Sequence, residues 1–279
     1  MNTQIIELSK LHPFQGQPYK VLDDAEMEAL TESVKLCGVM TPLTARPLEG
    51  RNQEYEIVSG HRRMRAAEKA GLKTVPAFVV PLDRTAAAIV LVDSNLHREH
   101  LLPSEKAFAY KLKLDALKQQ GKRNDLTSRQ DVEKLGSAEH VSETESGRQV
   151  QRYIRLTYLI PNMLNMVDEG RIALTPAVYL SYLSEPEQVW VLEEMQRNDC
   201  TPSLGQAQRL KEHGTKGLLT RDFVTGLMAQ EKANQLERLK IPVERIRKFF
   251  PASYTAAQME AEIVKMCEAR YRKRASMER

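Results

Sequence analysis

Residues 57–67 read Ile-Val-Ser-Gly-His-Arg-Arg-Met-Arg-Ala-Ala, with three arginines in four positions shortly after a glycine. The apolar run predicts a strand, Gly60 a turn, and the residues after it the first turn of a helix. Free N–H groups and the positive dipole end at a helix N-terminus suit an anion, and arginine adds forked donors that match phosphate. The stretch is therefore compatible with a phosphate-binding turn. The alternative is a solvated basic helix face, because short basic motifs are common.

The residues on either side of this turn alternate between strand-like and helix-like pieces. Short apolar runs predict strands over residues 4–8, 42–46, 55–58 and 75–80. Helices are predicted over residues 62–70 and over a segment that Asp23 or Asp24 caps and Gly38 ends. Residues 12–19 hold two prolines and a glycine, which predicts a loop. The first hundred residues are therefore expected to form an α+β domain.

From about residue 86 onward the pattern is almost wholly helical. Ser104, led by Pro103, is the expected cap of one of these helices, and the polar residues 121–129 are expected to form a surface loop. Three helical stretches are expected between residues 220 and 279. The other predicted helices cover residues 86–95, 104–120, 137–144, 147–158, 161–168, 176–182, 185–197 and 204–213.

Length and composition bound the class of protein. The chain has 279 residues, of which 42% are hydrophobic and 28% charged, so it suits two or three globular units. It has no apolar run of membrane-spanning length and no signal-peptide pattern, which favours a cytoplasmic protein. Cys37, Cys200 and Cys267 are far apart and have no metal-ligand spacing, so reduced thiols are expected. The net charge of +4 is too small to identify a nucleic-acid binder.

A second informative stretch is Ser-Gly-Arg-Gln-Val-Gln-Arg-Tyr-Ile-Arg-Leu at residues 146–156, with Ser146 as the expected cap. At helical spacing it separates a polar, basic face from an apolar one that holds Val150 and Ile154. Arginine and glutamine suit guanine and adenine edges and phosphate. With a helix over residues 137–144 before it, the layout predicts a helix-turn-helix; the alternative is an ordinary amphipathic helix. The candidate DNA-binding residues are Arg148, Gln149, Gln151, Arg152 and Arg155.

Four segments, taken in order, resemble the ParB partition family. Residues 60–66, Gly-His-Arg-Arg-Met-Arg-Ala, resemble its signature box, usually Gly-Glu-Arg-Arg-x-Arg-Ala. Residues 12–18, His-Pro-Phe-Gln-Gly-Gln-Pro, and residues 38–43, Gly-Val-Met-Thr-Pro-Leu, resemble two earlier boxes. Residues 95–98, Asn-Leu-His-Arg, and the segment 101–107 resemble the family's Asn-x-x-Arg helix and the linker after it. The resemblance extends to about residue 183.

This resemblance implies an N-terminal ParB/sulfiredoxin-like fold that binds CTP with magnesium, followed by helix-turn-helix and helical C-terminal domains. CTP binding in the family closes two protomers around double-stranded DNA. The resemblance thus implies a homodimer, a ParA-type ATPase partner, association with a nucleoid or plasmid, and no membrane partner. It assigns Asn95 to the metal and no residue to catalysis. The residues that would bind the nucleotide are Gly38, Thr41, Pro42, Gly60, His61, Arg62, Arg63, Arg65, Ala66, Asn95 and Arg98.

The chain departs from the family pattern at three positions. Thr41 stands where glutamine is usual, and His61 and Ser94 stand where the family has glutamates. Hard cations prefer anionic oxygen, so losing two carboxylates predicts weak or absent CTP hydrolysis. Gly60 occupies the place of the reactive cysteine of sulfiredoxin, which excludes that thiol chemistry.

These segments predict three domains. Residues 1–100 are expected to bind the nucleotide, residues 101–200 to bind DNA, and residues 201–279 to mediate dimerisation or a further DNA contact. A helical row of apolar residues could form either a core or a dimer seam: Leu227, Met259, Ile263 and Met266. The basic residues 270–274 could either contact DNA phosphates or be solvated. Two alternatives to a partition protein stay open. One is a transcription regulator that binds no nucleotide, and the other is a nuclease or kinase on the same fold.

Overall fold

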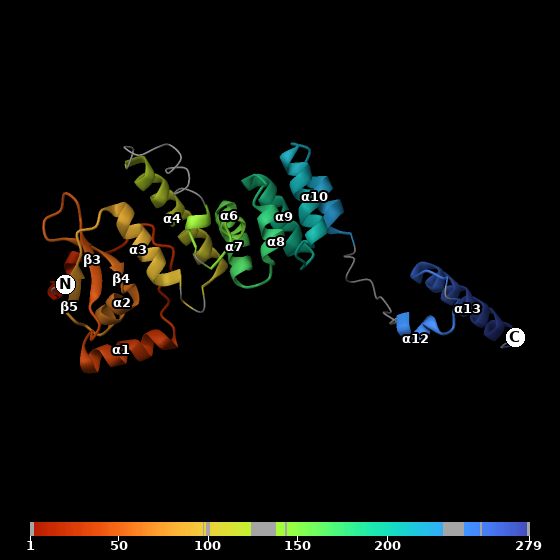
Figure 1. The fold of residues 1–279 in the computed structure, drawn as a ribbon, viewed down its shortest axis with the longest axis horizontal. Coiled ribbons are helices and arrows are strands. Elements are labelled where there is room, and N and C mark those ends of the chain that lie inside the picture. Colours follow the sequence, from red (N-terminus) through yellow and green to blue (C-terminus); the bar gives the residue numbers. More distant parts are fainter. Residues whose placement is uncertain are drawn as a thin grey trace. The chain divides into compact units, whose positions relative to one another are not determined.

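The computed structural model describes residues 3–96, 98, 101–123, 138–142, 144–230, 243–251 and 253–277. It divides into two compact units, residues 1–230 and 231–279, whose elements are labelled in Figure 1. The three-part division expected at residues 100 and 200 stays a prediction. Among the helices of the described ranges, none has the length and apolar character needed to cross a membrane.

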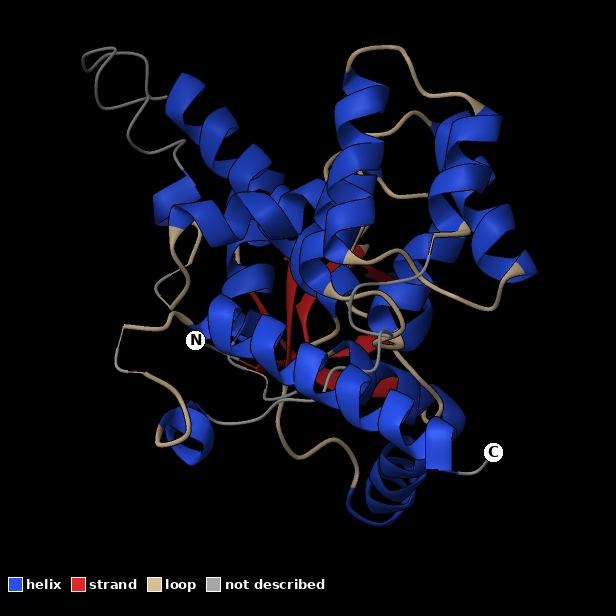
Figure 2. Ribbon diagram, turned by 90° about the vertical axis from the view of Figure 1, so that its right-hand side faces the viewer, coloured by secondary structure: helices blue, strands red, loops and turns tan. Residues whose placement is uncertain are grey.

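A five-stranded mixed sheet forms the N-terminal layer of the first unit, in the order β1–β5–β3–β4–β2. Strands β1 and β5 pair antiparallel, as do β3 and β4, whereas β3 pairs with β5 and β2 with β4 in parallel. Figure 2 shows these strands in red among helices in blue. The strands are β1 (Thr3–Glu7), β2 (Leu11–Pro13), β3 (Leu43–Pro47), β4 (Tyr55–Ser59) and β5 (Thr74–Val79).

Four of these strands are where the sequence predicts them, but β2 is not. Two of its three residues lie in the segment 12–19 that was predicted as a loop, and that prediction is wrong for His12 and Pro13. A strand of three residues that ends in proline is too short to show alternation, and it is held by parallel pairing with β4. Its position matters because the chain that leaves β2 forms one wall of the candidate site.

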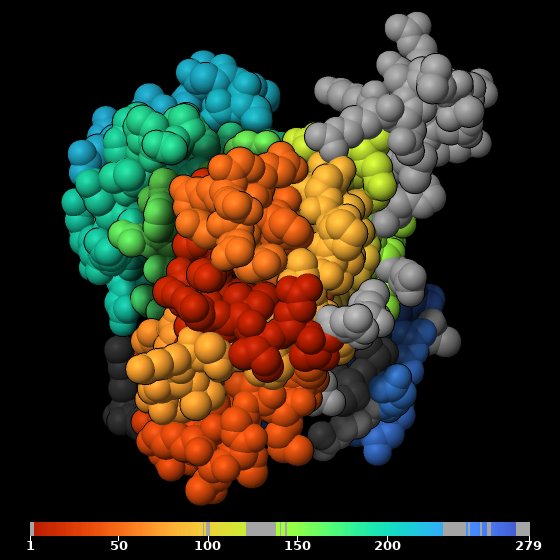
Figure 3. Space-filling model, turned by 90° about the vertical axis from the view of Figure 1, so that its left-hand side faces the viewer, coloured from red at the N-terminus to blue at the C-terminus, as the bar shows by residue number. Residues whose placement is uncertain are grey.

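Three helices complete this layer: α1 (Ala25–Cys37), α2 (His61–Lys69) and α3 (Arg84–Leu96). Asp24 caps α1 as predicted, accepting a hydrogen bond from the Met27 N–H at 2.8 Å. Apolar side chains of α1 and α2 pack with the sheet around Leu43 and Ile57, which are both fully buried. Figure 3 views this side of the molecule, where the red N-terminal strand lies beside orange surface of the same layer.

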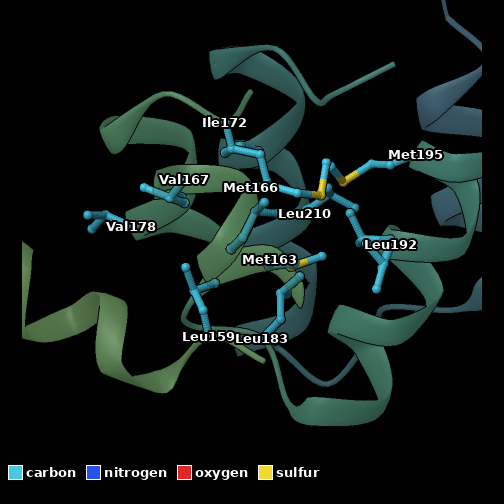
Figure 4. Close-up of a cluster of buried hydrophobic side chains, with 14 of the residues drawn as sticks. Leu159, Met163, Met166, Val167, Ile172, Val178, Leu183, Leu192, Met195 and Leu210 are labelled. Atoms are coloured by element: carbon cyan, nitrogen blue, oxygen red, sulfur yellow. The ribbon is translucent and has the colours of Figure 1, made fainter. Parts of the chain in front are cut away.

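The rest of the first unit is helical, so the predicted fold class, an α+β layer followed by helices, is confirmed. One core holds most of these helices together, around Met163, Leu183, Leu210 and other side chains that Figure 4 draws as sticks. The elements are α4 (Pro103–Arg123), η2 (Ala138–His140), α6 (Gly147–Arg155), η3 (Leu156–Tyr158), α7 (Pro161–Asp168), α8 (Leu174–Leu180), α9 (Glu185–Arg197), α10 (Leu204–Thr215) and α11 (Arg221–Met228).

Two local predictions in this region are wrong. The described part of residues 137–144 contains a single 3₁₀ turn, Ala138–His140, rather than a helix. Ser104 lies inside the first turn of α4, and its hydroxyl donates to Asp168 at 2.6 Å instead of capping the helix. The second difference arises from a contact that is distant in the sequence. Residues 124–129 of the predicted loop lie outside the described residues.

The second unit contains α12 (Val243–Arg247) and α13 (Ala256–Met277). Met259 is buried within it, whereas Met266 and Tyr271 are exposed. The predicted seam is wrong for Leu227, which lies in the core of the first unit instead. The side chains of residues 272–274 in the basic tail lie outside the described ones.

Candidate nucleotide pocket and DNA-facing helix

A pocket of about 240 Å³ opens where β4 passes into α2, beside the C-terminal part of α3. Among the described residues, four cationic side chains and no carboxylate line it. The Gly60 turn, the Asn95 segment and the loop after β2 meet at this pocket. The lining residues are Gln17, Tyr19, Lys20, Val21, Ser59, Gly60, His61, Arg62, Arg63, Ser94, Asn95 and Arg98.

Gly60 makes this turn because its backbone has φ +104°, in the left-handed region that favours glycine. A Cβ at this position would lie 3.1 Å from Leu43 Cγ and 3.1 Å from Arg63 Nη2. Gly60 is also the N-cap of α2, and no side chain caps the helix. The first-turn N–H groups of α2 therefore lack a side-chain acceptor, which is the arrangement that suits an anion.

The three arginines after this glycine have different partners. Arg62 lies at the pocket and pairs with Asp24 at 3.1 Å and Glu26 at 3.2 Å. Arg63 donates from Nη1 to the Thr41 and Pro42 carbonyls at 2.6 and 2.7 Å. Arg63 thus holds the loop before β3 against the start of α2.

Arg65 differs from the other two because it lies outside the pocket lining. It pairs with Asp23 at 2.9 Å and with Glu68 at 3.5 Å. Among the predicted nucleotide residues, the lining contains Gly60, His61, Arg62, Arg63, Asn95 and Arg98. The others, Gly38, Thr41, Pro42, Arg65 and Ala66, lie outside it. Ala66 is fully buried in the core under the sheet, and Gly38 ends α1.

His61 is largely enclosed, and its Nε2 accepts a hydrogen bond from the Phe14 N–H at 3.4 Å. Burial, together with the positive charge of Arg98, lowers the pKa of His61 to about 4, and the charge of Glu56 opposes both. The imidazole is therefore neutral at neutral pH. A neutral side chain thus stands where the family pattern has a carboxylate.

The loop after β2 contributes pocket residues that the site prediction missed. Gln17, Tyr19, Lys20 and Val21 all line the pocket. The Arg98 guanidinium lies 5.8 Å from the centre of the Tyr19 ring, and the Tyr19 hydroxyl donates to the Val92 carbonyl at 3.3 Å. The resemblance over residues 12–18 pointed to this loop, but no residue pattern within it indicates that it contacts a ligand.

Lys20 ties the pocket wall to the helices that follow. Its Nζ lies 3.1 Å from Asp168 Oδ2, and its backbone N–H donates to Glu105 Oε1 at 2.8 Å. Asp168 also accepts from the Ser104 N–H at 2.9 Å. Residues from α4 and α7 therefore set the position of a cation that lines the pocket.

The pocket suits a polyanion better than a bare metal ion. Within the described residues, no group of three or more His, Cys, Asp or Glu side chains could hold a metal. The Asn95 amide nitrogen donates to the Leu91 carbonyl at 2.8 Å and to Ser94 Oγ at 3.2 Å. The amide oxygen of Asn95 is thus the atom left to bind magnesium, and phosphate oxygens and water would supply the other ligands.

Helix α6 carries the candidate DNA-binding residues. Ser146 caps it as predicted, accepting from the Gln149 N–H at 3.3 Å, and Val150 and Ile154 are buried against α4. Arg148 and Gln151 are exposed. Arg152 instead donates to Gln149 Oε1 at 3.0 Å and to Thr175 Oγ1 at 2.5 Å.

Arg155 is also held by the protein. Its Nη2 donates to the Ser181 carbonyl at 2.8 Å, and its guanidinium lies against two tyrosine rings. The structure therefore separates the predicted set into exposed side chains and side chains with fixed positions. The first helix of the predicted helix-turn-helix is not found over the described part of residues 137–144.

Comparisons with known proteins agree on one family. Residues 1–96 match the model of the ParB N-terminal domain. The chain is 33% identical over 208 residues to the chromosome-partitioning protein Spo0J of Thermus thermophilus, covering 74% of this chain and 69% of that protein. It is 36% identical over 170 residues to the stage 0 sporulation protein J of Bacillus subtilis, and the match covers 61% of this chain and 54% of that protein. The chain thus spans about half to two thirds of the length of these relatives.

Two solved structures of Caulobacter crescentus ParB are also similar. One is complexed with CTP-gamma-S: it is 24% identical, the match covers 75% of this chain and 99% of that chain, and the TM-score is 0.33. The other is complexed to the centromeric parS site: it is 23% identical, the match covers 75% and 98%, and the TM-score is 0.40.

Proposed function

The chain belongs to the ParB family of chromosome-partitioning proteins, and from this membership we propose that it is a sequence-specific DNA-binding partition protein that binds CTP. The observation that carries the proposal is the pocket at Gly60. Lys20, Arg62, Arg63 and Arg98 converge there on the uncapped start of a helix, and none of the described residues that line the pocket is a carboxylate. Carboxylates outside the lining pair with Lys20 and Arg62, and the positive charge of Arg63, Arg98 and the helix N-terminus favours an anion of several charges.

The residues of the pocket have separable roles in this proposal. Arg62 and Arg98 bind the phosphate groups, and the N–H groups of α2 donate to them. Arg63 keeps the loop at Thr41 and Pro42 in place, so that these two residues and Gly38 meet the cytosine. Asn95 offers an oxygen to magnesium, which would neutralise phosphate charge. Hydrolysis is slow or absent, because His61 is neutral and Ser94 carries no charge.

The DNA-binding part of the proposal rests on α6. Arg148 and Gln151 are exposed on the same side of this helix, and the opposite side packs against α4. Arginine and glutamine donate to guanine and adenine edges in the major groove. A homodimer, a ParA-type ATPase partner and association with a nucleoid or plasmid in the cytoplasm are further parts of the proposal, and they rest on the family alone.

Calorimetric titration with CTP, ATP, GTP and UTP, with and without double-stranded DNA, tests the proposal. We expect CTP to bind and the other three nucleotides to bind at least tenfold more weakly. DNA binding without any nucleotide binding would favour a transcription regulator. DNA cleavage, or phosphoryl transfer from a bound triphosphate to a second substrate, would favour the enzyme alternatives.

A further inference from the structure

The C-terminal end of α6 leads into a surface where three cations lie over three tyrosine rings. Two of these rings, Tyr158 and Tyr182, are 53% and 41% exposed. The residues come from α4, α6, η3, the end of α8 and α10, and α8 packs against both α6 and α10. We call this the cation–tyrosine patch, defined as Lys111, Arg155, Tyr158, Tyr179, Tyr182 and Lys211.

The charges of the patch are close together. The Arg155 guanidinium lies 3.9 Å from the centre of the Tyr182 ring, and the Lys211 ammonium lies 4.0 Å from the same centre. Arg155 is also 4.5 Å from the Tyr158 ring, and Lys111 is 5.3 Å from that ring. The rings attract each cation, but they carry no net charge to offset the repulsion among the three.

No carboxylate among the described residues forms an ion pair with Lys111, Arg155 or Lys211. Other lysines of α4 differ in this respect: Lys106 pairs with Glu145 at 3.0 Å and Lys113 with Asp93 at 2.5 Å. The tyrosine hydroxyls of the patch likewise form no hydrogen bond with described residues. The Nε of Arg155 is buried and has no partner. The patch therefore presents positive charge that no carboxylate of the described residues pairs with, which fits an anionic partner.

The patch continues the exposed side of α6. Arg148, Gln151 and Arg155 recur at helical spacing, so the patch begins where the row of exposed residues on α6 ends. Recognition helices contact base edges by their N-terminal part. Lysine, arginine and tyrosine side chains bind phosphate oxygens, and such contacts position a protein on the duplex without reading its sequence.

We propose that the cation–tyrosine patch binds the phosphodiester backbone of double-stranded DNA beside the groove that α6 enters. This inference rests on the proposed DNA binding. It adds α4, α8 and α10 to the DNA interface and extends that interface to Lys211. The contact is independent of base sequence, because it is made with phosphate. Arg155 serves it with a guanidinium already fixed by Ser181 and by two aromatic rings.

The test is the salt dependence of DNA affinity for a Lys111→Ala/Lys211→Ala double variant of the full chain. Fluorescence anisotropy is measured at salt concentrations from about 50 to about 300 mM. One series uses a random-sequence duplex, and the other uses a duplex that the wild-type chain selects from a random library. Each lost phosphate contact should lower the log–log slope by about 0.9, so we expect a fall of about 1.8 on both duplexes. Hydroxyl-radical footprints should also lose protection at the flank of the selected site.

The matched control is Lys216→Ala, which removes an exposed lysine at the C-terminal end of α10 that lies outside the patch. Its slope should equal that of the wild type. Thermal unfolding checks that the double variant is folded, since its two lysines lose only contacts with tyrosine rings of the patch. A wild-type slope and footprint in the double variant would overturn the inference while leaving the proposed DNA binding intact, and would favour an acidic protein partner. Failure of the wild type to bind any duplex would overturn both.

Discussion

Lys20 Nζ and Asp168 Oδ2 lie 3.1 Å apart, which links the wall of the pocket to the end of α7 across 148 residues of sequence. The side chain of Asp168 is only 8% exposed, and it also accepts two hydrogen bonds from Ser104. The same carboxylate thus fixes a pocket cation and the start of α4. This contact gives one prediction about stability, and the pocket gives four more.

Asp168→Asn should destabilise the first unit. An amide has one acceptor oxygen where the carboxylate has two, and its N–H₂ would face the donors of Lys20 and Ser104. Leaving buried donors unsatisfied costs about 1–3 kcal/mol. Urea unfolding measures the effect, with Lys20→Met as the control. Because Lys20 is half exposed, its loss should cost less than about 1 kcal/mol. Equal stability of Asp168→Asn and wild type would contradict the assigned role of this carboxylate.

Arg62→Ala should weaken CTP binding by about 10- to 100-fold, since a hydrogen bond to a charged group contributes roughly 1.5–3 kcal/mol. Arg65→Ala is the matched control, because it lies on the same helix but outside the pocket lining and pairs with Asp23. The affinity of the Arg65→Ala variant for CTP should stay within about twofold of the wild-type value. Titration calorimetry measures both, and similar losses in the two variants would mean that the pocket residues are wrongly assigned.

Gly60→Ala should lower both stability and nucleotide affinity. The new Cβ would require an alanine at φ +104° and would approach Leu43 and Arg63 to 3.1 Å. Such backbone strain costs on the order of 1–3 kcal/mol. Gly205→Ala provides the comparison, since nothing lies within 4 Å of the added Cβ and the backbone there is not left-handed. It should be neutral or slightly stabilising. A Gly60→Ala protein as stable as Gly205→Ala would refute this account of the turn.

His61 should make stability fall in acid. Its pKa is lowered to about 4, chiefly by burial, whereas the unfolded chain should titrate near the ordinary value of 6.5. Between pH 4 and 6.5 the unfolded state binds more protons, so unfolding becomes easier as the pH falls through this window. The loss is at most about 3 kcal/mol. Unfolding of wild type and His61→Gln from pH 7.5 to pH 4 tests this, and the difference between them should shrink or reverse in acid. A difference that is independent of pH would refute a neutral His61.

Hydrolysis of CTP should be slow in the wild type and faster in a His61→Glu/Ser94→Glu variant. The two carboxylates would supply anionic oxygen for magnesium and for positioning water, which neutral imidazole and hydroxyl groups do not. Phosphate release under saturating CTP is the measurement. The control is the Ser94→Glu variant alone, which restores one carboxylate and should hydrolyse at an intermediate rate. Rapid release by the wild type would show that the family's glutamates are not needed here.

Much of the pocket could be predicted because it is local in sequence. Gly60 and the arginines after it form one strand–turn–helix unit, and its tendency to bind an anion follows from helix geometry alone. Arg62 and Arg65, by contrast, are alike in the sequence. The two differ in their partners, Asp24 for Arg62 and Asp23 for Arg65, which lie just before α1.

The parts that could not be predicted depend on long-range contacts. Lys20 lines the pocket because Glu105 and Asp168 hold its backbone and its ammonium group. Arg155 was expected to be a free basic residue, but Ser181 and two tyrosines fix it. The helix expected over residues 137–144 rested on local propensity in a segment with poor apolar register, and such propensity is a weak guide on its own.

The two edges of the sheet are unequal, and this bears on aggregation. The β2 edge has three residues and ends in Pro13, which has no N–H to offer an incoming strand. The β1 edge is five residues long and contains Ile5, which is 69% exposed. If partly unfolded or concentrated protein self-associates through its strands, β1 is where the chains should pair. A lysine at Ile5 would then raise solubility while leaving the pocket untouched.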